Sequence, residues 1–417
     1  MDIIITNACL ANYQHKVTIK IKDGLIVAIE DNHTESYEDK ASENNVNPTI
    51  YDAKSNFVCA GFYESHIHLD KACILDRCNI ETGDLDEAVN ETGKAKAAFS
   101  EDDVYERACT VIEMAIKKGT VGMRSFVETD AKTQLRSFNA IKKAREKYAF
   151  AMDIEICAFA QDGLTTAPET YTLLKQALTQ GADLVGGCPY KDEHPDRHIE
   201  MIFDLAEQFD VNVDFHLDFD LDPEGSSIPK VVEETIKRQY QGRVSIGHVT
   251  KLSAMDNLQR GAMAGLLKFA DISLTVLPAT DIYLNGRDYE ALIPRGMVNA
   301  NELADLGINT TIASNNILNA FTPYGDASLI RMGNMYANIA QLSKDKDIEA
   351  VFDMIGKNAA KILSMHAEIA IGAPATLVVL EAKDAVSAIR TNAQALAGFK
   401  NGKQTFCNAA AVILSGL

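Results

Sequence analysis

The fold of this chain is indicated by one stretch near its start, Gly61-Phe62-Tyr63-Glu64-Ser65-His66-Ile67-His68-Leu69. It is the first of eight short apolar runs, and the spacers between them have the pattern of amphipathic helices. The runs cover residues 61–69, 121–128, 154–161, 182–188, 211–218, 244–249, 272–279 and 309–314. Strands that alternate with helices favour a parallel sheet, and eight of them predict a (β/α)₈ barrel of the TIM type. A doubly wound open sheet is the alternative, although no glycine-rich phosphate loop follows the first run.

Both ends of the chain predict a second, smaller β unit. Residues 16–21 alternate with period two, and Asp23-Gly24 separates them from the apolar run 25–29, which is typical of a hairpin. Residues 377–380 form a buried type of strand, and residues 399–404 repeat the hairpin pattern around Asn401-Gly402. We expect residues 1–56 and 367–417 to form one small composite domain, similar to a β-sandwich, and residues 57–366 to form the barrel. The polar stretch 31–48 is expected to be a surface loop.

Composition limits the classes of partner. The 417 residues are 47% hydrophobic and 24% charged, which suffices for one large barrel or for two to three smaller domains. The formal net charge of −19 would repel a phosphate backbone, and the sequence has no basic cluster to offset it, so nucleic acid is not an expected partner. The composition leaves a homo-oligomer open.

The cysteines and the apolar runs bear on the compartment. Eight cysteines are scattered through apolar stretches without a C-x-x-C pair, a pattern that favours reduced thiols. The first residues lack a basic region followed by a long apolar run, and the sequence holds no stretch of about 18 continuous apolar residues for a membrane span. We therefore expect a soluble, cytoplasmic protein that does not bind membranes.

Four of the nine histidines lie at the ends of expected strands. His66 and His68 close the first run on one face, His216 lies near the end of the fifth, and His248 lies near the end of the sixth. Taken alone, His66 and His68 could equally lie on a solvated strand face. Barrel enzymes build their sites at the carboxyl ends of the strands, and neutral imidazoles are metal ligands, so a shared site is the better interpretation. The remaining five histidines are expected at the surface or in packing contacts: 15, 33, 194, 198 and 366.

The segment 58–71, which contains the H-x-H pair, resembles the first-strand signature of the cytosine deaminase and N-isopropylammelide isopropylaminohydrolase group of the amidohydrolase superfamily. Further segments resemble that group in the same order along nearly the whole chain: 157–163, 182–187, 214–218, 247–250 and 282–287. The resemblance implies that one divalent metal ion, Zn²⁺ or Fe²⁺, binds to His66, His68 and His216 and activates water. It implies that His248 stabilises the developing charge and that Gln161 recognises the amide edge of a small heterocyclic substrate.

The end of the fourth expected strand favours one metal ion over two. Many relatives in the superfamily bind two metals through a lysine at that strand end, whereas here it reads Gly187-Cys188-Pro189.

Two positions depart from the family pattern. An aspartate that binds the metal and accepts a proton from water is expected at the end of the eighth strand, where this chain has Asn315. A neutral amide oxygen can still approach a metal, but it cannot accept that proton. The glutamate that cytosine deaminases carry three residues past the fifth-strand histidine is replaced by Phe219.

A proton acceptor must therefore come from elsewhere, or turnover must be slow. Four nearby residues are candidates: Asp218, Asp220, Lys71 and Glu128. For Lys71 the alternative is a structural pair with Asp70 or a solvated amine, and for Glu128 it is a structural hydrogen bond.

Three functions remain open from the sequence. The first is hydrolysis of an exocyclic C–N bond, by deamination or loss of an alkylamine, in a heterocyclic amidine such as a pyrimidine or triazine. The second is a catalytically impaired barrel that binds a small molecule, which Asn315 and Phe219 favour. The third is cyclic-amide hydrolysis of the dihydroorotase or hydantoin type, which usually requires two metals.

Overall fold

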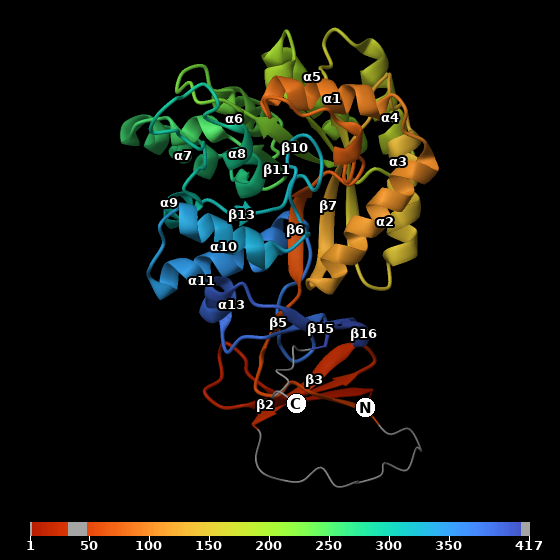
Figure 1. Ribbon diagram of the computed structural model, residues 1–417, viewed down its shortest axis with the longest axis vertical. Helices are drawn as coiled ribbons and strands as arrows, with labels where there is room; N and C mark the ends of the chain where they lie inside the picture. The colour runs from red at the N-terminus through yellow and green to blue at the C-terminus, as the bar shows by residue number, and fades with distance from the viewer. Residues whose placement is uncertain (1, 32–47, 410–417) are drawn as a thin grey trace.

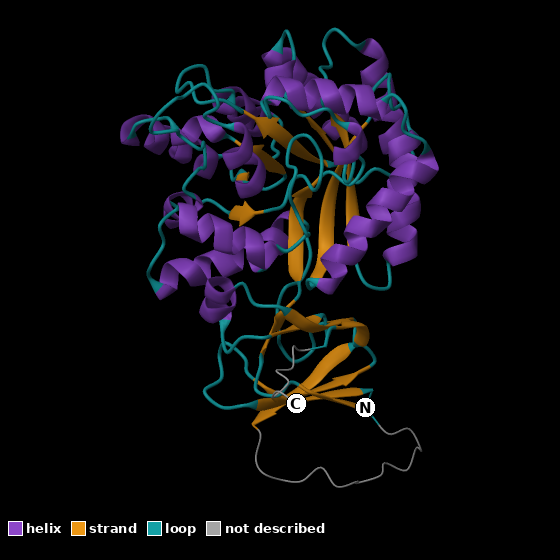
Figure 2. Ribbon diagram, viewed as in Figure 1, coloured by secondary structure: helices purple, strands orange, loops and turns teal. Residues whose placement is uncertain are grey.

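The computed structural model describes residues 2–31 and 48–409. The chain forms a large barrel surrounded by helices, with two small sheets below it in Figure 1. Figure 2 shows the strands of the large sheet enclosed by helices, whereas the small sheets have little helical cover. The surface loop expected at residues 31–48 falls almost entirely outside the described residues.

The large sheet confirms the predicted (β/α)₈ barrel. Its strands are all parallel and follow one another in sequence order, β6 to β13. Their bounds are β6 Phe62–Ile67, β7 Thr120–Glu128, β8 Asp153–Ala160, β9 Leu184–Gly187, β10 Asn212–Leu217, β11 Val244–His248, β12 Ser273–Val276 and β13 Thr310–Ile312.

Asn315 closes the barrel through its backbone. Its N–H donates to the carbonyl of His66 at 2.9 Å, and its carbonyl accepts from the N–H of His68 at 2.8 Å. A parallel bridge between Ile67 and Asn315 thus joins the end of β13 to β6. The backbone at position 315 is fixed directly between two of the predicted metal ligands.

Helices fill the connections between the strands. The amphipathic pattern expected of the spacers is seen in α2 Glu101–Lys117, which buries Val104, Ala108 and Val111. The α-helices are α1 Leu85–Lys96, α2 Glu101–Lys117, α3 Arg136–Tyr148, α4 Pro168–Thr179, α5 Pro195–Phe209, α6 Ile228–Lys237, α7 Asn257–Phe269, α8 Pro278–Leu284, α9 Ala300–Asp305, α10 Leu329–Ile339, α11 Asp345–Ile355, α12 Lys357–Ile362 and α13 Ala385–Thr391. Short 3₁₀ turns are η1 Leu75–Arg77, η2 Pro189–Lys191 and η3 Thr250–Ser253.

The seventh strand is shorter than predicted. The apolar run 272–279 was expected to be one strand, but β12 ends at Val276 and α8 begins at Pro278. Proline is favoured in the first turn of a helix because its missing N–H has no partner to lose there. The chain therefore turns away from the sheet before Ala279.

Two four-stranded sheets form the small unit. The first has the order β3-β2-β1-β4 and the second β16-β15-β14-β5. Their bounds are β1 Ile3–Ala8, β2 Val17–Lys22, β3 Leu25–Asp31, β4 Thr49–Asp52, β5 Phe57–Ala60, β14 Leu377–Leu380, β15 Ala395–Lys400 and β16 Lys403–Cys407. Both predicted hairpins are present, β2 with β3 and β15 with β16. The division at residues 56 and 367 stays a prediction, and β5, just past the first boundary, pairs with β14.

Within the described ranges, no helix combines the length and apolarity that crossing a membrane requires.

Candidate active site

Three imidazoles meet at the carboxyl ends of β6 and β10. The Nε2 atom of His216 lies 3.1 Å from Nε2 of His66 and 2.9 Å from Nε2 of His68. Period-two geometry turns His66 and His68 to the same side of β6, and His216 faces them from across the barrel. Gly247 leaves space for this arrangement, because a Cβ atom there would lie 2.7 Å from Cε1 of His66.

The donor set fits one small cation. Ligand nitrogens at 2.0–2.1 Å from a tetrahedral metal lie about 3.3 Å apart, close to the two separations observed. Burial is the largest effect lowering the pKa of His66, His68 and His216 well below the ordinary value, and neighbouring cationic groups add to it. Neutral imidazole is the form that binds metals. All three rings are buried.

His248 and Asp281 form a buried pair beside this cluster. Nδ1 of His248 lies 2.7 Å from Oδ1 of Asp281, and the carboxylate also accepts from the N–H of Leu277. A proton on Nδ1 donates to the carboxylate, which leaves Nε2 of His248 as an acceptor. The amide nitrogen of Asn315 lies 3.4 Å from that Nε2. His248 has a φ of +68° and Asn315 a φ of +61°, left-handed conformations that non-glycine residues adopt mainly at turns and functional sites.

The orientation of Asn315 leaves its oxygen free. The amide nitrogen faces His248, while the buried Oδ1 has no hydrogen-bond partner among the described residues. An unpaired buried amide oxygen is costly, and a cation at the three histidines would satisfy it. The predicted role of Asn315 as a weak, neutral ligand is compatible with this geometry.

Lys71 is buried, and its ammonium group forms no ion pair with Asp70. Its Nζ donates to Oε1 of Glu128 at 2.7 Å and to Oε1 of Gln161 at 3.2 Å. The amine also lies 4.7 Å from the ring centroid of Phe321. Lys71 and Gln161 therefore act as one polar pair on the cavity wall.

Glu128 is shared by two lysines. Lys96, at the end of α1, donates to the other oxygen of Glu128 at 2.7 Å and also to Asp130 and Asp162. Burial by itself raises the pKa of Glu128, but the two lysines outweigh it and hold the pKa at about 2. An ionised carboxylate bound by two amines is a poor proton acceptor, so Glu128 serves to hold Lys71.

The structure does not bring Asp218 into the cavity. Its carboxylate accepts from the hydroxyl of Ser226 at 2.6 Å and the N–H of Ser227 at 3.0 Å, which organise the loop after β10. Asp218 has a φ of +50°, a left-handed conformation just after β10. Asp220 pairs with Lys251 at 2.7 Å. Neither acidic side chain lines the cavity.

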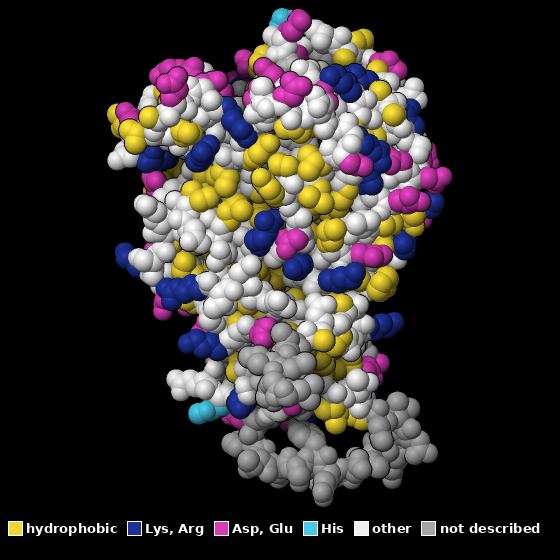
Figure 3. All heavy atoms as spheres, in the orientation of Figure 1, with side chains coloured by type: hydrophobic (Ala, Val, Ile, Leu, Met, Phe, Trp, Pro, Cys, Tyr) yellow, Lys and Arg dark blue, Asp and Glu magenta, His cyan; other side chains and the backbone are white. Residues whose placement is uncertain are grey.

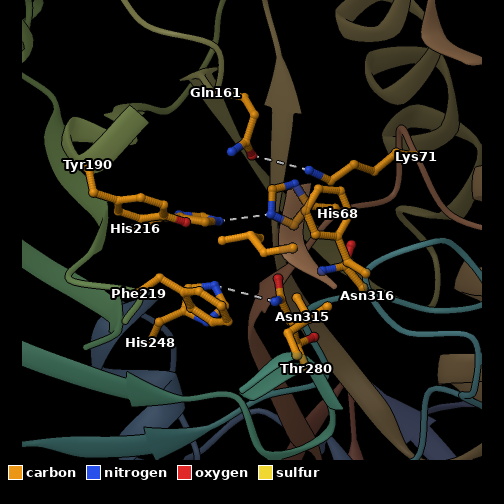
Figure 4. Close-up of a pocket in the computed structure, with 13 residues that line it drawn as sticks. His68, Lys71, Gln161, Tyr190, His216, Phe219, His248, Thr280, Asn315 and Asn316 are labelled. Atoms are coloured by element: carbon orange, nitrogen blue, oxygen red, sulfur yellow. Dashed lines mark hydrogen bonds between the residues drawn. The ribbon is translucent and has the colours of Figure 1, made fainter. Parts of the chain in front are cut away.

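The cavity above the histidines is small. Its volume is about 20 Å³, room for one or two water molecules. In Figure 4, Gln161 and Lys71 lie above His216 and His68, and His248 and Asn315 lie below them. The lining residues are His68, Lys71, Leu85, Gln161, Tyr190, His216, Phe219, His248, Thr280, Leu284, Asn315, Asn316 and Phe321. Phe219 stands edge-on to His248 at 4.8 Å, which gives the replaced glutamate position an apolar role.

Sequence reasoning missed Asp281 and Lys96. Two features of the sequence could have indicated Asp281. It directly precedes the segment 282–287, which resembles the family pattern, and it lies close to the end of β12. Lys96 carried no signal, because its partners are 32 to 66 residues away along the chain. The histidines expected at the surface or in packing include His198, which is buried and contacts Asp192 at 2.9 Å.

Comparison with known proteins decides the family. A model described as the amidohydrolase family matches residues 92–406. The chain belongs to the amidohydrolase family. The matched region begins after His66 and His68 and includes His216, His248 and Asn315.

Relatives of this amidohydrolase act on nitrogen heterocycles. N-isopropylammelide isopropyl amidohydrolase of Pseudomonas sp. (strain ADP) is 26% identical over 96% of each chain. Pterin deaminase of Rhizobium rhizogenes is 25% identical over 80% of this chain and 76% of its own. The crystal structure of 5-methylcytosine deaminase from Klebsiella pneumoniae with 5-fluorocytosine superposes with a TM-score of 0.90, at 26% identity and 99% coverage of both chains.

Proposed function

We propose that this amidohydrolase hydrolyses an exocyclic C–N bond of a heterocyclic amidine, by deamination or by loss of an alkylamine. The observation that carries the proposal is the convergence of three buried Nε2 atoms beside a His–Asp pair and a Gln–Lys pair. The relatives named above cleave such bonds in ammelide, pterin and cytosine rings. Ring identity is part of the proposal, and a pyrimidine or triazine suits a recognition pair that presents an amide and an amine.

His66, His68 and His216 would hold one divalent ion, Zn²⁺ or Fe²⁺, with the free oxygen of Asn315 as a weak fourth contact. Such an ion supplies the positive charge that activates water for attack on carbon. Among the described residues, His66, His68 and His216 are the one group of possible ligands that could hold a metal ion, which supports one ion per chain rather than two.

His248 is placed to move the proton. Its Nε2 faces the cavity as an acceptor, because Asp281 holds the proton on Nδ1. Asp281 also stabilises the imidazolium that forms when Nε2 takes a proton from water. The same Nε2–H can then donate to the leaving amine, so one residue serves as base and acid. His248 thereby takes over the proton transfer that Asn315 cannot perform.

Gln161 and Lys71 would position the ring. Gln161 presents an amide to the cavity, and Lys71, held by Glu128, presents a donor with a positive charge. A cyclic amidine or amide carries donors and acceptors on one edge, which this pair can match. Because the cavity holds only about 20 Å³, the apolar wall formed by Leu85, Phe219 and Phe321 must move to admit a ring.

The direct test is amine release by metal-replete protein. Cytosine, 5-methylcytosine, pterin and N-isopropylammelide would be incubated with protein loaded with Zn²⁺ or Fe²⁺, and both ammonia and isopropylamine measured. We expect turnover of at least one ring class, abolished by a chelator and restored by the metal. No release from any member of a broad heterocycle panel would overturn the proposal.

Asn315 and Phe219 favour a second candidate, a barrel that binds a small heterocycle with little turnover. The variant Asn315→Asp separates the two functions. For an enzyme with an impaired proton acceptor, we expect kcat to rise about 100-fold, the lower range of general acid–base effects. Ligand binding without turnover in both forms, seen as a thermal shift without amine release, would support the binder.

A further inference from the structure

A second cavity lies on the outer side of α8 and is independent of the proposed activity. Its volume is about 500 Å³, and its walls include Ile282, Tyr283 and Met335. The opposite side of α8 supplies Thr280 and Leu284 to the active cavity. The two cavities also share a hydrogen bond, because Thr280 contacts Thr322 of the outer cavity at 2.7 Å. One short helix thus separates the catalytic centre from this hollow.

Arginines surround the outer cavity. Arg287, Arg295 and Arg331 all line it. Arg331 pairs with Asp326 at 2.9 Å, but in the described part of the chain no carboxylate forms an ion pair with Arg287 or Arg295. Both of these side chains are exposed. Two guanidinium groups without acidic partners are notable in a chain with a net charge of −19.

The loop between these two arginines exposes apolar side chains. Leu292 is 100% exposed with a φ of +49°, Tyr289 is 51% exposed, and Ile293 is 40% exposed. Tyr324, on the cavity wall, is 65% exposed. Figure 3 shows hydrophobic side chains gathered over the part of the barrel where Figure 1 places α8. Apolar patches of this kind on a surface mark interaction sites.

The loop 288–293 also carries negative charges, whereas the charged residues of the cavity are arginines. Asp288 and Glu290 are exposed, and neither forms an ion pair within residues 2–31 and 48–409. The loop 288–293 therefore combines apolar side chains with carboxylates that form no ion pair. The adjacent cavity combines apolar walls with two arginines that form no ion pair in the described residues, although Arg287 donates to the carbonyls of Tyr283 and Thr82. One part is an exposed loop and the other is a hollow, and the two carry opposite charges. Arg287 and Arg295 flank the loop in sequence.

We propose that this surface is an interface between two copies of the chain, in which the loop 288–293 of each copy enters the outer cavity of the other. A two-fold interface requires one patch that contains both complementary parts, and this patch does. Leu292 inserts against Ile282, Tyr283 and Met335, and Asp288 and Glu290 reach Arg287 and Arg295. The dimer covers the outer side of α8.

Sedimentation velocity over a range of protein concentrations tests the interface. We expect the wild type to sediment at twice the 45.5 kDa of one chain. Leu292→Asp occurs twice in a symmetric dimer and should raise its dissociation constant at least about 30-fold, the effect of losing one central contact. Leu258→Asp is the matched control, since Leu258 is 83% exposed on α7 and does not line the outer cavity.

A charge exchange sharpens the test. Arg295→Glu and Glu290→Arg should each weaken the dimer, and the double variant should recover it, because the reversed charges meet again across the two-fold axis. Three outcomes would overturn the proposal: a wild-type mass of one chain at all concentrations, an assembly whose mass Leu292→Asp leaves unchanged, or an equal effect of Leu258→Asp. A melting temperature close to the wild-type value verifies that each variant is folded.

Discussion

Two layers of side chains inside the barrel differ in how their polar atoms are satisfied. Glu64, Arg124 and Asp214 stand two residues before His66, Phe126 and His216 on the same strands, so they form the layer nearer the amino ends. In that lower layer Arg124 pairs with Asp214 at 3.0 Å and with Glu155 at 2.9 Å. Its Nη2 atom, which forms the pair with Glu155, also donates to the carbonyl of Ile362 at 2.8 Å.

The upper layer has the opposite character. Within the described residues, the Nε2 atoms of His66 and His68 converge to 3.1 Å and 2.9 Å from Nε2 of His216, and Oδ1 of Asn315 lacks a hydrogen-bond partner. In the ionic group around Arg124, only Oδ1 of Asp214 lacks one among the described residues. Buried polar atoms that are paired stabilise the fold, and buried polar atoms that converge without partners indicate a ligand. The contrast separates a structural layer from a functional one, although both are fully buried.

Removing an upper-layer ligand should produce the largest effect. His216→Ala leaves two imidazoles, which hold a divalent ion poorly. Charge stabilisation by a metal amounts to several kcal/mol, so kcat/KM should fall at least about 1000-fold. Steady-state amine release measures the loss, and a variant with less than a tenfold decrease would place the chemistry elsewhere.

Removing a lower-layer charge should instead affect stability. Asp214→Asn leaves Arg124 buried with one carboxylate fewer, at a cost of about 3 kcal/mol in the free energy of unfolding. Urea denaturation of the metal-free protein at pH 7 gives this value. The variant should retain its metal. A loss below about 1 kcal/mol, the range of exposed pairs, would contradict the distinction between the layers.

Asp281 tests whether His248 is positioned for proton transfer. Asp281→Asn keeps the size of the side chain but can donate to Nδ1 of His248, which would shift the ring proton to Nε2. We expect kcat to fall about 100-fold with KM and metal content nearly unchanged. Unchanged kcat would mean that His248 binds substrate without moving a proton.

A partly exposed carboxylate between two arginines should have the smallest effect. Asp103 contacts Arg77 at 2.6 Å and Arg107 at 3.0 Å, and these contacts, with the Arg77 hydrogen bond as the largest cause, lower the pKa of Asp103 from 3.8 to about 2. A lowered carboxyl pKa stabilises the fold above the unfolded value of 3.8, and this stabilisation is lost as the pH falls from 3.8 towards 2. Asp103→Asn should therefore cost at most about 1 kcal/mol at pH 6 and less at pH 3.

Thermal unfolding of both proteins at the two pH values measures that difference. An Asp103→Asn effect that grows as the pH falls would show that the sign is wrong.

Much of the barrel could be predicted from the sequence because each strand is buried on both sides and reads as a continuous apolar run. The convergence of His66, His68 and His216 followed from the same rule, since parallel strands end at one rim. The predicted end of the seventh strand was wrong, because Pro278 starts a helix inside the apolar run 272–279. Asp281 was missed for the same reason, as it lies on that helix rather than on a strand.

Side-chain partners were harder to predict than side-chain positions. Lys71 was singled out, but its pair with Glu128 depends on Lys96, which arrives from the end of α1. Asp218 shares a strand face with His216 in an ideal strand, but its left-handed backbone turns it towards Ser226. Neither long-range pairing nor local backbone reversal is encoded in a period-two pattern.

The central claim is that His66, His68 and His216 bind one divalent ion. Elemental analysis of chelator-stripped protein, reloaded with Zn²⁺ or Fe²⁺ and desalted, tests it most directly, with His216→Ala and Asp214→Asn measured in parallel. We predict one ion per chain in the wild type and in Asp214→Asn, and almost none in His216→Ala. Wild-type protein that retains no ion, or His216→Ala that retains a full one, would contradict the account.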